Sequence, residues 1–198
     1  MTSYRQGCHR RAMRLKGYDY SQAGIYFVTA CAHRRICLFG EVKGSEMVSN
    51  EFGQVVHTLW LRLAERYAQA TLDALVLMPN HIHAIVEIAD VAGNVGAIHE
   101  LPLQDQLQRR RMLIPRVVGW LKMTSAKRIN LMRGTPGVPV WQRNYWEHVV
   151  RNEESMRRIR EYIMSNPQRW HLDRQNPDRI GEDDFDRWLA GPFSSAAK

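Results

Sequence analysis

The stretch that most constrains the fold is MPNHIHAIVEI, residues 78–88. After the Pro-Asn break its residues alternate in character with a period of two, which is typical of a strand with two different faces. One face is entirely apolar and consists of Ile82, Ala84, Val86 and Ile88. The other face is polar and carries His81, His83 and Glu87. The sequence therefore predicts a strand that buries its apolar face against helices and presents two imidazoles on the opposite face.

The rest of the chain alternates between strand-like and helix-like segments. Segments rich in β-branched and aromatic residues predict strands at 24–32, on both sides of the break in 72–88, at 140–151, and a short strand or turn at 34–42. Apolar residues at helical spacing predict helices at 49–67, 115–133 and 152–166. Ser49 or Asn50 should cap the first helix, Pro115 suits the first turn of the second, and Asn152 should cap the third. This order predicts an α+β fold with a small, mainly antiparallel sheet backed by helices.

Length and composition fit one soluble domain. The chain has 198 residues, of which 44% are hydrophobic and 24% charged. We expect a basic arm at 1–17, a domain at 18–177, and a loosely attached C-terminal tail at 178–198. No segment is long and apolar enough for a membrane span, and Cys8, Cys31 and Cys37 form no CxxC pair. These features favour a reducing compartment, so the expected location is the cytoplasm.

The charge balance indicates a polyanionic partner. The formal net charge is +8, which suits either nucleic acid or an anionic membrane surface. Residues 109–133 contain eight Lys or Arg and no acidic residue, which favours a phosphate-facing surface over a merely solvated one. The candidate DNA-binding residues are Lys122, Lys127, Arg128, Arg143 and, as a weaker stacking candidate, Trp141. The sequence contains neither a GxSxG nor a P-loop motif.

The histidine pair suits a metal site. In a strand, the Cα atoms of His81 and His83 lie about 7 Å apart, since each residue advances the chain by roughly 3.3 Å. From there two ring nitrogens can converge on one divalent ion, and a third ligand must come from elsewhere. A half-buried polar face with hydrogen-bonded histidines is the alternative, and the spacing alone does not exclude it.

The third predicted helix supplies a nucleophile and a possible ligand. Met156, Ile159 and Ile163 form its apolar stripe. Tyr162 and Asn166 are four residues apart and therefore neighbours on one edge of that stripe. A boundary tyrosine followed by a helix stop at Asn166-Pro167 is the simpler alternative. Taken with the histidines, however, a phenol beside an amide suits nucleophilic attack on a metal-polarised phosphodiester.

Four segments, in order, resemble the single-tyrosine transposases of the HUH endonuclease superfamily, most closely the REP-associated tyrosine transposases. These segments are YFVTACAHRRICLF, LVLMPNHIHAIVEI, VVGWLKMTSAKRIN and VWQRNYWEHVVRNEESMRRIREYIMSNPQRW. The resemblance covers roughly residues 18–177, which would then be the catalytic domain. It implies a ferredoxin-like, RRM-like antiparallel sheet with helices packed on one face.

The resemblance also implies an activity and its residues. The activity is cleavage and rejoining of single-stranded, hairpin (REP-type) DNA through a 5′-phosphotyrosine, with Mg²⁺ or Mn²⁺. His81 and His83 match the paired metal ligands, Tyr162 matches the catalytic tyrosine, and Asn166 stands where relatives place a polar third ligand. The expected partner is single-stranded or hairpin DNA and not a membrane, with the chain acting as a monomer or a homodimer.

Two other functions remain open at this point. A non-catalytic protein that binds single-stranded nucleic acid would keep the sheet and the basic surface, but it would be expected to lose the histidine pair or the tyrosine. A metal-dependent hydrolase that uses water would keep the metal site and form no covalent DNA adduct.

Overall fold

The computed structural model describes residues 23–89 and 112–191. A four-stranded sheet runs in the order β4-β5-β1-β6, and each neighbouring pair is antiparallel. Its strands are β1 (Gly24–Cys31), β4 (Ala70–Met78), β5 (His81–Ile88) and β6 (Trp146–Val150). A separate two-stranded ribbon consists of β2 (Gly40–Lys43) and β3 (Glu46–Ser49).

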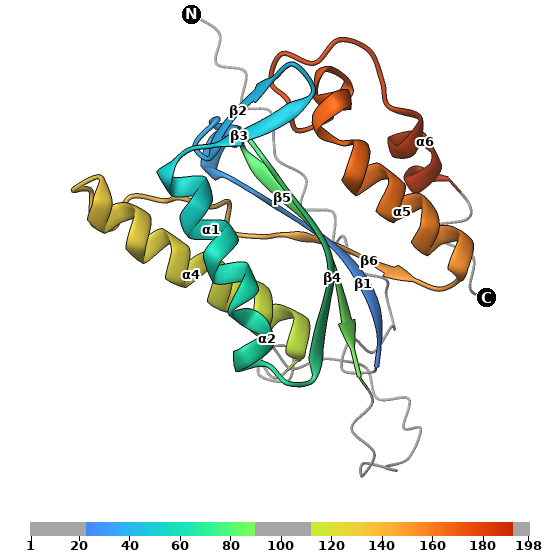
Figure 1. The fold of residues 1–198 in the computed structure, drawn as a ribbon, viewed down its shortest axis with the longest axis horizontal. Helices are drawn as coiled ribbons and strands as arrows, with labels where there is room; N and C mark the ends of the chain where they lie inside the picture. The colour runs from blue at the N-terminus through green and yellow to red at the C-terminus, as the bar shows by residue number, and fades with distance from the viewer. Residues whose placement is uncertain (1–22, 90–111, 192–198) are drawn as a thin grey trace, which may run out of the picture.

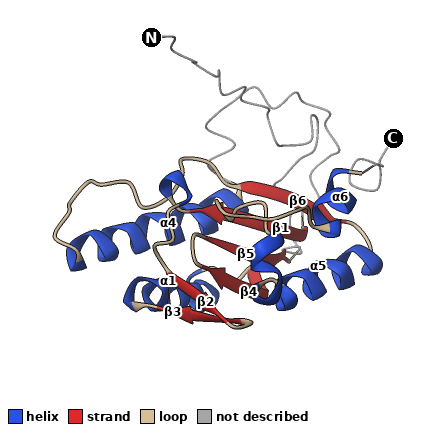
Figure 2. Cartoon of the chain, turned by 90° about the horizontal axis from the view of Figure 1, so that it is seen from above, coloured by secondary structure: helices blue, strands red, loops and turns tan. Residues whose placement is uncertain are grey.

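The helices lie on both sides of the four-stranded sheet (Figures 1 and 2). They are α1 (Glu51–Leu61), α2 (Leu63–Arg66), α4 (Leu113–Met132), α5 (Glu153–Ser165) and α6 (Asp184–Ala190), with 3₁₀ turns η1 (His33–Arg35) and η2 (Pro167–Leu172). The α+β class and the antiparallel sheet confirm the predicted fold. Helices α1 and α4 share one face, as expected, but α5 and α6 cover the other face, so the expectation that helices pack on one face only is wrong.

The two faces of β5 belong to two different hydrophobic cores. The apolar residues Ile82, Ala84, Val86 and Ile88 pack with buried residues of α1 and α4, as the alternation predicts. On the opposite face, Phe27 and Ile85 pack with the α5 residues Ile159 and Ile163. His81 and His83 lie on this second face, and the sheet therefore presents both imidazoles toward α5.

The predicted helix starts are confirmed by hydrogen bonds. The side chain of Asn50 accepts from the backbone N–H groups of Phe52 and Gly53, and that of Asn152 accepts from Ser155. Each bond satisfies a donor that has no partner within the helix. Asn50, not Ser49, is therefore the cap of α1.

Three segments differ from their predictions. Residues 140–145 are not part of β6, and their pairing with β1 is limited to an isolated bridge between Ala32 and Trp141. The segment 34–42, predicted as a short strand or turn, is divided between both: residues 33–35 form a turn in which Arg34 and Arg35 have φ of 55° and 57°, and β2 begins only at Gly40. Residues 184–190 of the predicted tail form α6 and are firmly packed, because Phe185 and Leu189 are buried. The basic arm at 1–17 and residues 90–111 lie outside the described residues.

Two helical glycines make a matched pair for testing the packing of α1. A Cβ at Gly53 would overlap the carbonyl oxygen of Phe39, whereas a Cβ at Gly119, on the exposed face of α4, would meet nothing within 4 Å. We expect Gly53→Ala to lower the free energy of unfolding by about 1–3 kcal/mol through overpacking. Gly119→Ala should raise it by about 0.5–1 kcal/mol, because alanine favours helix. Urea denaturation measures both, and equal effects of the same sign would contradict the close contact between α1 and Phe39.

Candidate active site

Three buried side chains form a cluster with the geometry of a metal site. His81 and His83 come from β5, and Asp173 comes from the loop that follows η2. The Nε2 atoms of the two histidines lie 3.5 and 3.8 Å from Oδ2 of Asp173. One ligand atom of each residue lies within 4.8 Å of the other two. Two imidazoles and a carboxylate in this arrangement are a common ligand set for divalent transition metals.

The outer nitrogen of each imidazole is held by a neighbouring polar side chain. Nδ1 of His81 is 2.8 Å from Oδ1 of Asn80, an acceptor, so Nδ1 carries the proton and Nε2 presents its lone pair. Nδ1 of His83 is 2.7 Å from Oγ1 of Thr29 on β1. Partners of this kind fix the ring orientation of metal-binding histidines. The MPNHIH sequence therefore places each Nε2 toward the cluster.

Asn80 also joins three segments of the chain around the site. Its side chain is fully buried, and Nδ2 donates to the carbonyl oxygen of Arg35 at 2.9 Å and to that of Gln175 at 2.8 Å. The asparagine between Pro79 and His81 thus holds the 33–35 turn and the 173–175 loop against the start of β5. Its loss would leave two buried carbonyl groups without this donor.

Tyr162 lies against the cluster, as the sequence predicts. Its hydroxyl is 3.3 Å from Nε2 of His83 and donates to Oδ2 of Asp173, also at 3.3 Å. The ring is only 3% exposed. It stacks on Phe185 of α6, with ring centres 3.8 Å apart and planes 9° from parallel. Residues separated by 79 positions in the sequence, Tyr162 and His83, therefore meet in one site.

Burial keeps the histidine and the tyrosine neutral. Burial, and then the neighbouring His83, lowers the pKa of His81 to about 3, so the ring holds no extra proton at pH 7. Burial, and then the charges of nearby carboxylates led by Asp173, raises the pKa of Tyr162 well above its usual range. A neutral imidazole is ready to ligate a cation, whereas the phenol needs a cation or a base nearby before it can act as a nucleophile.

The Asp173 carboxylate is the polar centre of the site. Oδ1 accepts the backbone N–H of Gln175 at 2.6 Å, and Oδ2 accepts Nδ2 of Asn166 at 3.0 Å. Burial opposes ionisation, but a hydrogen bond with His83 and electrostatic interactions with both histidines outweigh it and hold the pKa of this carboxyl below its usual range. Asp173 is therefore an anion facing two imidazoles and a phenol.

Asn166 lies beside the cluster but not in the position of a simple third ligand. It caps the end of α5, is fully buried, and its amide nitrogen supports Asp173. Its Oδ1 atom has no hydrogen-bond partner, as is also true of Nε2 of His81. Buried polar atoms without partners are uncommon, and the unpaired Nε2 of His81, 3.5 Å from Oδ2 of Asp173, fits a bound cation. The predicted ligand role of Asn166 remains a prediction, and the structure adds Asp173 as a candidate ligand.

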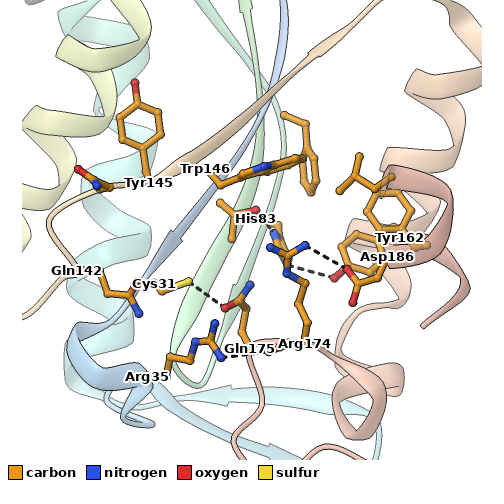
Figure 3. Close-up of a pocket in the computed structure, with 15 residues that line it drawn as sticks. Cys31, Arg35, His83, Gln142, Tyr145, Trp146, Tyr162, Arg174, Gln175 and Asp186 are labelled. Carbon is orange, nitrogen blue, oxygen red and sulfur yellow. Dashed lines mark hydrogen bonds and ion pairs between the residues drawn. The ribbon is translucent and has the colours of Figure 1, made fainter. Parts of the chain in front are cut away.

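A cavity of about 120 Å³ opens beside the tyrosine (Figure 3). Its wall includes Tyr162 and His83 from the cluster and Trp146 from the start of β6. Arg35 and Arg174 line the same cavity. A ligand in this space would therefore meet the phenol, an imidazole and two guanidinium groups.

The predicted DNA-binding residues fall into two groups. Lys127, Arg128 and Arg143 are exposed. Lys122 instead donates to the carbonyl oxygens of Arg143 and Asn144, at 3.0 and 3.3 Å, and so holds the 142–145 segment to α4. Trp141 is buried, with its indole N–H donating to Oγ of Ser125 at 2.9 Å, and is not placed to stack on a base.

Sequence reasoning missed Asp173, Asn80 and Thr29. Asp173 follows an irregular turn, where neither a period of two nor one of 3.6 can place a side chain. A weak signal was present, because a metal site with two histidines needs another ligand and the HLDRQNP stretch, residues 171–177, offers a carboxylate just after the tyrosine helix.

Comparison with known proteins gives two relatives by sequence. No known protein-family profile matches the chain. A Haemophilus influenzae protein described as "Uncharacterized protein" is 38% identical over 180 residues, which are 87% of this chain and 96% of that protein. A second protein from the same species, described as "Putative REP-associated tyrosine transposase", is 23% identical over 149 residues, which are 75% of this chain and 73% of that protein.

Two solved structures are similar to the chain. "Structure of the REP associates tyrosine transposase bound to a REP hairpin" is 21% identical with a TM-score of 0.46, covering 100% of this chain and 93% of the other. A structure of a "putative transposase" from Deinococcus radiodurans R1 is 19% identical with a TM-score of 0.43, covering 76% of this chain and 96% of the other.

The sequence matches establish the relationship. The 38% identity extends over nearly the full length of the first Haemophilus protein, and the match to the second Haemophilus protein agrees with the motifs around the histidine pair and the tyrosine. The chain belongs to the family of the first Haemophilus protein and is related to the REP-associated tyrosine transposases, which confirms the resemblance predicted from its sequence.

Proposed function

We propose that this chain cleaves and rejoins single-stranded DNA, with Tyr162 as the nucleophile and a divalent metal ion as cofactor. The observation that carries the proposal is the position of the Tyr162 hydroxyl. It lies 3.3 Å from both His83 and Asp173 and lines a cavity large enough to admit a phosphate group. The relationship to a protein described as a REP-associated tyrosine transposase supports the same class of reaction.

The cluster residues suit Mg²⁺ or Mn²⁺. His81, His83 and Asp173 would hold the ion, with Asn166 as a further candidate ligand. When bound, such an ion polarises the phosphodiester and offsets the charge that develops on its oxygens. The outer partners Asn80 and Thr29 keep both imidazoles oriented toward this position.

The chemistry of the chain's own residues follows from the hydrogen bonds. Oη of Tyr162 attacks the phosphorus atom, the bond from phosphorus to the 3′ oxygen breaks, and the products are a 5′-phosphotyrosine and a free 3′-hydroxyl. The hydrogen bond from Tyr162 to Oδ2 of Asp173 orients the hydroxyl, the phenolic proton passes to water, and the leaving 3′ oxygen takes a proton from water. In the reverse direction a 3′-hydroxyl attacks the phosphotyrosine and restores the DNA strand without any external energy source.

The aromatic surroundings protect the covalent intermediate. Phe185 covers one face of the Tyr162 ring, and Phe27 meets it edge-on with ring centres 6.3 Å apart. These side chains restrict the approach of water, which would otherwise hydrolyse the phosphotyrosine and prevent rejoining.

The exposed cations outside the cavity suit the rest of the substrate. Lys127 and Arg128 on α4, together with Arg143, are accessible to a DNA backbone. We propose a hairpin of the REP type as the substrate, bound in the cytoplasm and not at a membrane. Among the described residues there is no helix with the length and apolar character that a bilayer crossing requires.

The covalent intermediate gives the first test. With Mn²⁺ and labelled hairpin DNA from the sequence flanking its gene, we expect an adduct that migrates slowly on a denaturing gel. Tyr162→Phe should abolish it, because the attacking oxygen is gone. Tyr67→Phe is the control, since the Tyr67 hydroxyl donates to the Arg116 carbonyl oxygen, away from the cluster. Cleavage that survives in Tyr162→Phe would indicate a water-using hydrolase, and binding without cleavage would indicate a non-catalytic protein.

The metal site gives the second test. Removing one ligand or its support should weaken Mn²⁺ binding by about 10- to 100-fold. Asp173→Asn keeps the shape of the side chain and removes its charge, so we expect this loss in isothermal titration calorimetry. Asp178→Asn, an exposed position in the same loop, is the control and should bind like the unchanged protein.

Asn166→Ala extends the metal test to the predicted third ligand. A loss of affinity as large as that of Asp173→Asn would support direct ligation by Asn166. A smaller loss would assign it the supporting hydrogen bond to Asp173. Unchanged Mn²⁺ affinity in Asp173→Asn would contradict the proposed centre.

A further inference from the structure

Two arginines on the cavity wall have no assigned role. Arg174 directly follows the buried Asp173, and its guanidinium extends toward His83 and Asp186 (Figure 3). Arg35 lies lower on the same wall, and its Nη1 donates to the carbonyl oxygen of Arg174 at 3.5 Å. Neither position belongs to a helical or strand pattern, so periodicity does not select these two arginines.

The backbone fixes both arginines relative to the histidines. Arg35 adopts a left-handed conformation, φ 57°, which is unusual for a residue with a side chain and occurs often at functional sites. Its carbonyl oxygen and that of Gln175 accept hydrogen bonds from the buried Asn80. One asparagine therefore holds the loops of Arg35 and Arg174 and orients the His81 ring.

The charge of Arg174 is only weakly engaged. Its nearest carboxylate oxygen among the described residues, Oδ1 of Asp186, is 3.8 Å from Nη1, which is longer than a hydrogen bond. The Arg174 side chain is 41% exposed, so a ligand in the cavity can reach it. The carboxylate of Asp186 also marks a position where an anionic oxygen fits beside the guanidinium. The fork of N–H donors in arginine matches the oxygens of a phosphodiester.

We infer that Arg174 binds a non-bridging oxygen of the scissile phosphate, in the place now taken by the Asp186 carboxylate, and that Arg35 binds the neighbouring phosphate of the same strand. The inference rests on the proposed function and names the residues that receive its substrate. Arg174 keeps its protons throughout the reaction. The bond formed joins Oη of Tyr162 to phosphorus, the bond broken joins phosphorus to the 3′ oxygen, and the guanidinium stabilises the added charge in the transition state.

A purely structural role is the competing explanation. Arg174 would then serve to tie its loop to α6 through Asp186, and its removal would weaken the fold without changing how phosphate charge is recognised. The two roles differ in one measurable property, which is the preference for a charged phosphate at a single position of the DNA.

Binding in the absence of metal and catalysis separates these roles. The protein carrying Tyr162→Phe is titrated in EDTA with hairpin oligonucleotides, each with one phosphate replaced by a neutral methylphosphonate. With Arg174 present, we expect substitution at one position, the scissile phosphate, to weaken binding by about 10- to 100-fold, the effect of one charged hydrogen-bonding contact. Arg174→Ala should bind the charged and neutral forms equally.

Matched variants control for general charge. Arg179→Ala removes a cation from the same loop outside the cavity and should keep the full preference. Arg35→Ala should lose the preference at the adjacent phosphate, whereas Arg34→Ala, its neighbour outside the cavity lining, should not. Asp186→Asn removes the competing carboxylate and should tighten binding of the charged oligonucleotide only.

The outcomes distinguish this inference from the proposed function. An Arg174→Ala protein that retains the full preference would overturn the inference, as would an Asp186→Asn protein that binds both DNA forms more weakly. If Arg174→Ala does not fold, the Asp186→Asn result decides alone. If Arg174→Ala loses the preference but the protein with Tyr162 intact forms no covalent adduct, the phosphate site is supported and the tyrosine chemistry is rejected.

Discussion

The ionised carboxylate of Asp173, buried among two imidazoles and a phenol, is the interaction on which the rest of the site depends. An isolated buried charge is costly, and the surrounding structure offsets that cost with hydrogen bonds from Gln175, Asn166 and Tyr162. These bonds join the end of α5 to the loop after η2, and they place Oδ2 of Asp173 3.5 and 3.8 Å from the histidines of β5. The Nε2 atoms of both histidines then face an anion, which is an arrangement that a divalent cation completes.

Much of the fold follows from local patterns in the sequence. The alternation in MPNHIHAIVEI is enough to separate the two faces of β5, because a one-residue change of register would bury the imidazoles among the α1 and α4 side chains. Asn50 and Asn152 identify helix starts through a single hydrogen-bonding mechanism. The position of Tyr162 near the histidines was predictable. The apolar stripe of α5 packs against one face of the sheet, and a tyrosine on the edge of that stripe lies close to this face.

Features set by long-range packing were not predictable in the same way. Asp173 and Arg174 lie in an irregular segment, and the partner that orients them, Asn80, is more than 90 positions away in the sequence. Trp141 was only a weak stacking candidate in an aromatic, basic stretch, and its indole is buried against Phe39, with ring centres 4.7 Å apart. Helix α6 has only seven residues. The burial of its apolar residues Phe185 and Leu189 depends on packing with α5, which the local sequence does not reveal.

The location of a metal ion tests the central claim most directly. Crystals grown with Mn²⁺ can be measured for anomalous scattering, which identifies the ion independently of any activity. We expect one strong peak bonded to Nε2 of His81 and Nε2 of His83, with an Asp173 oxygen in its coordination sphere and Tyr162 alongside. A well-diffracting crystal with no peak between the two histidines, or with Mn²⁺ bound only elsewhere, would contradict a metal-assisted tyrosine mechanism.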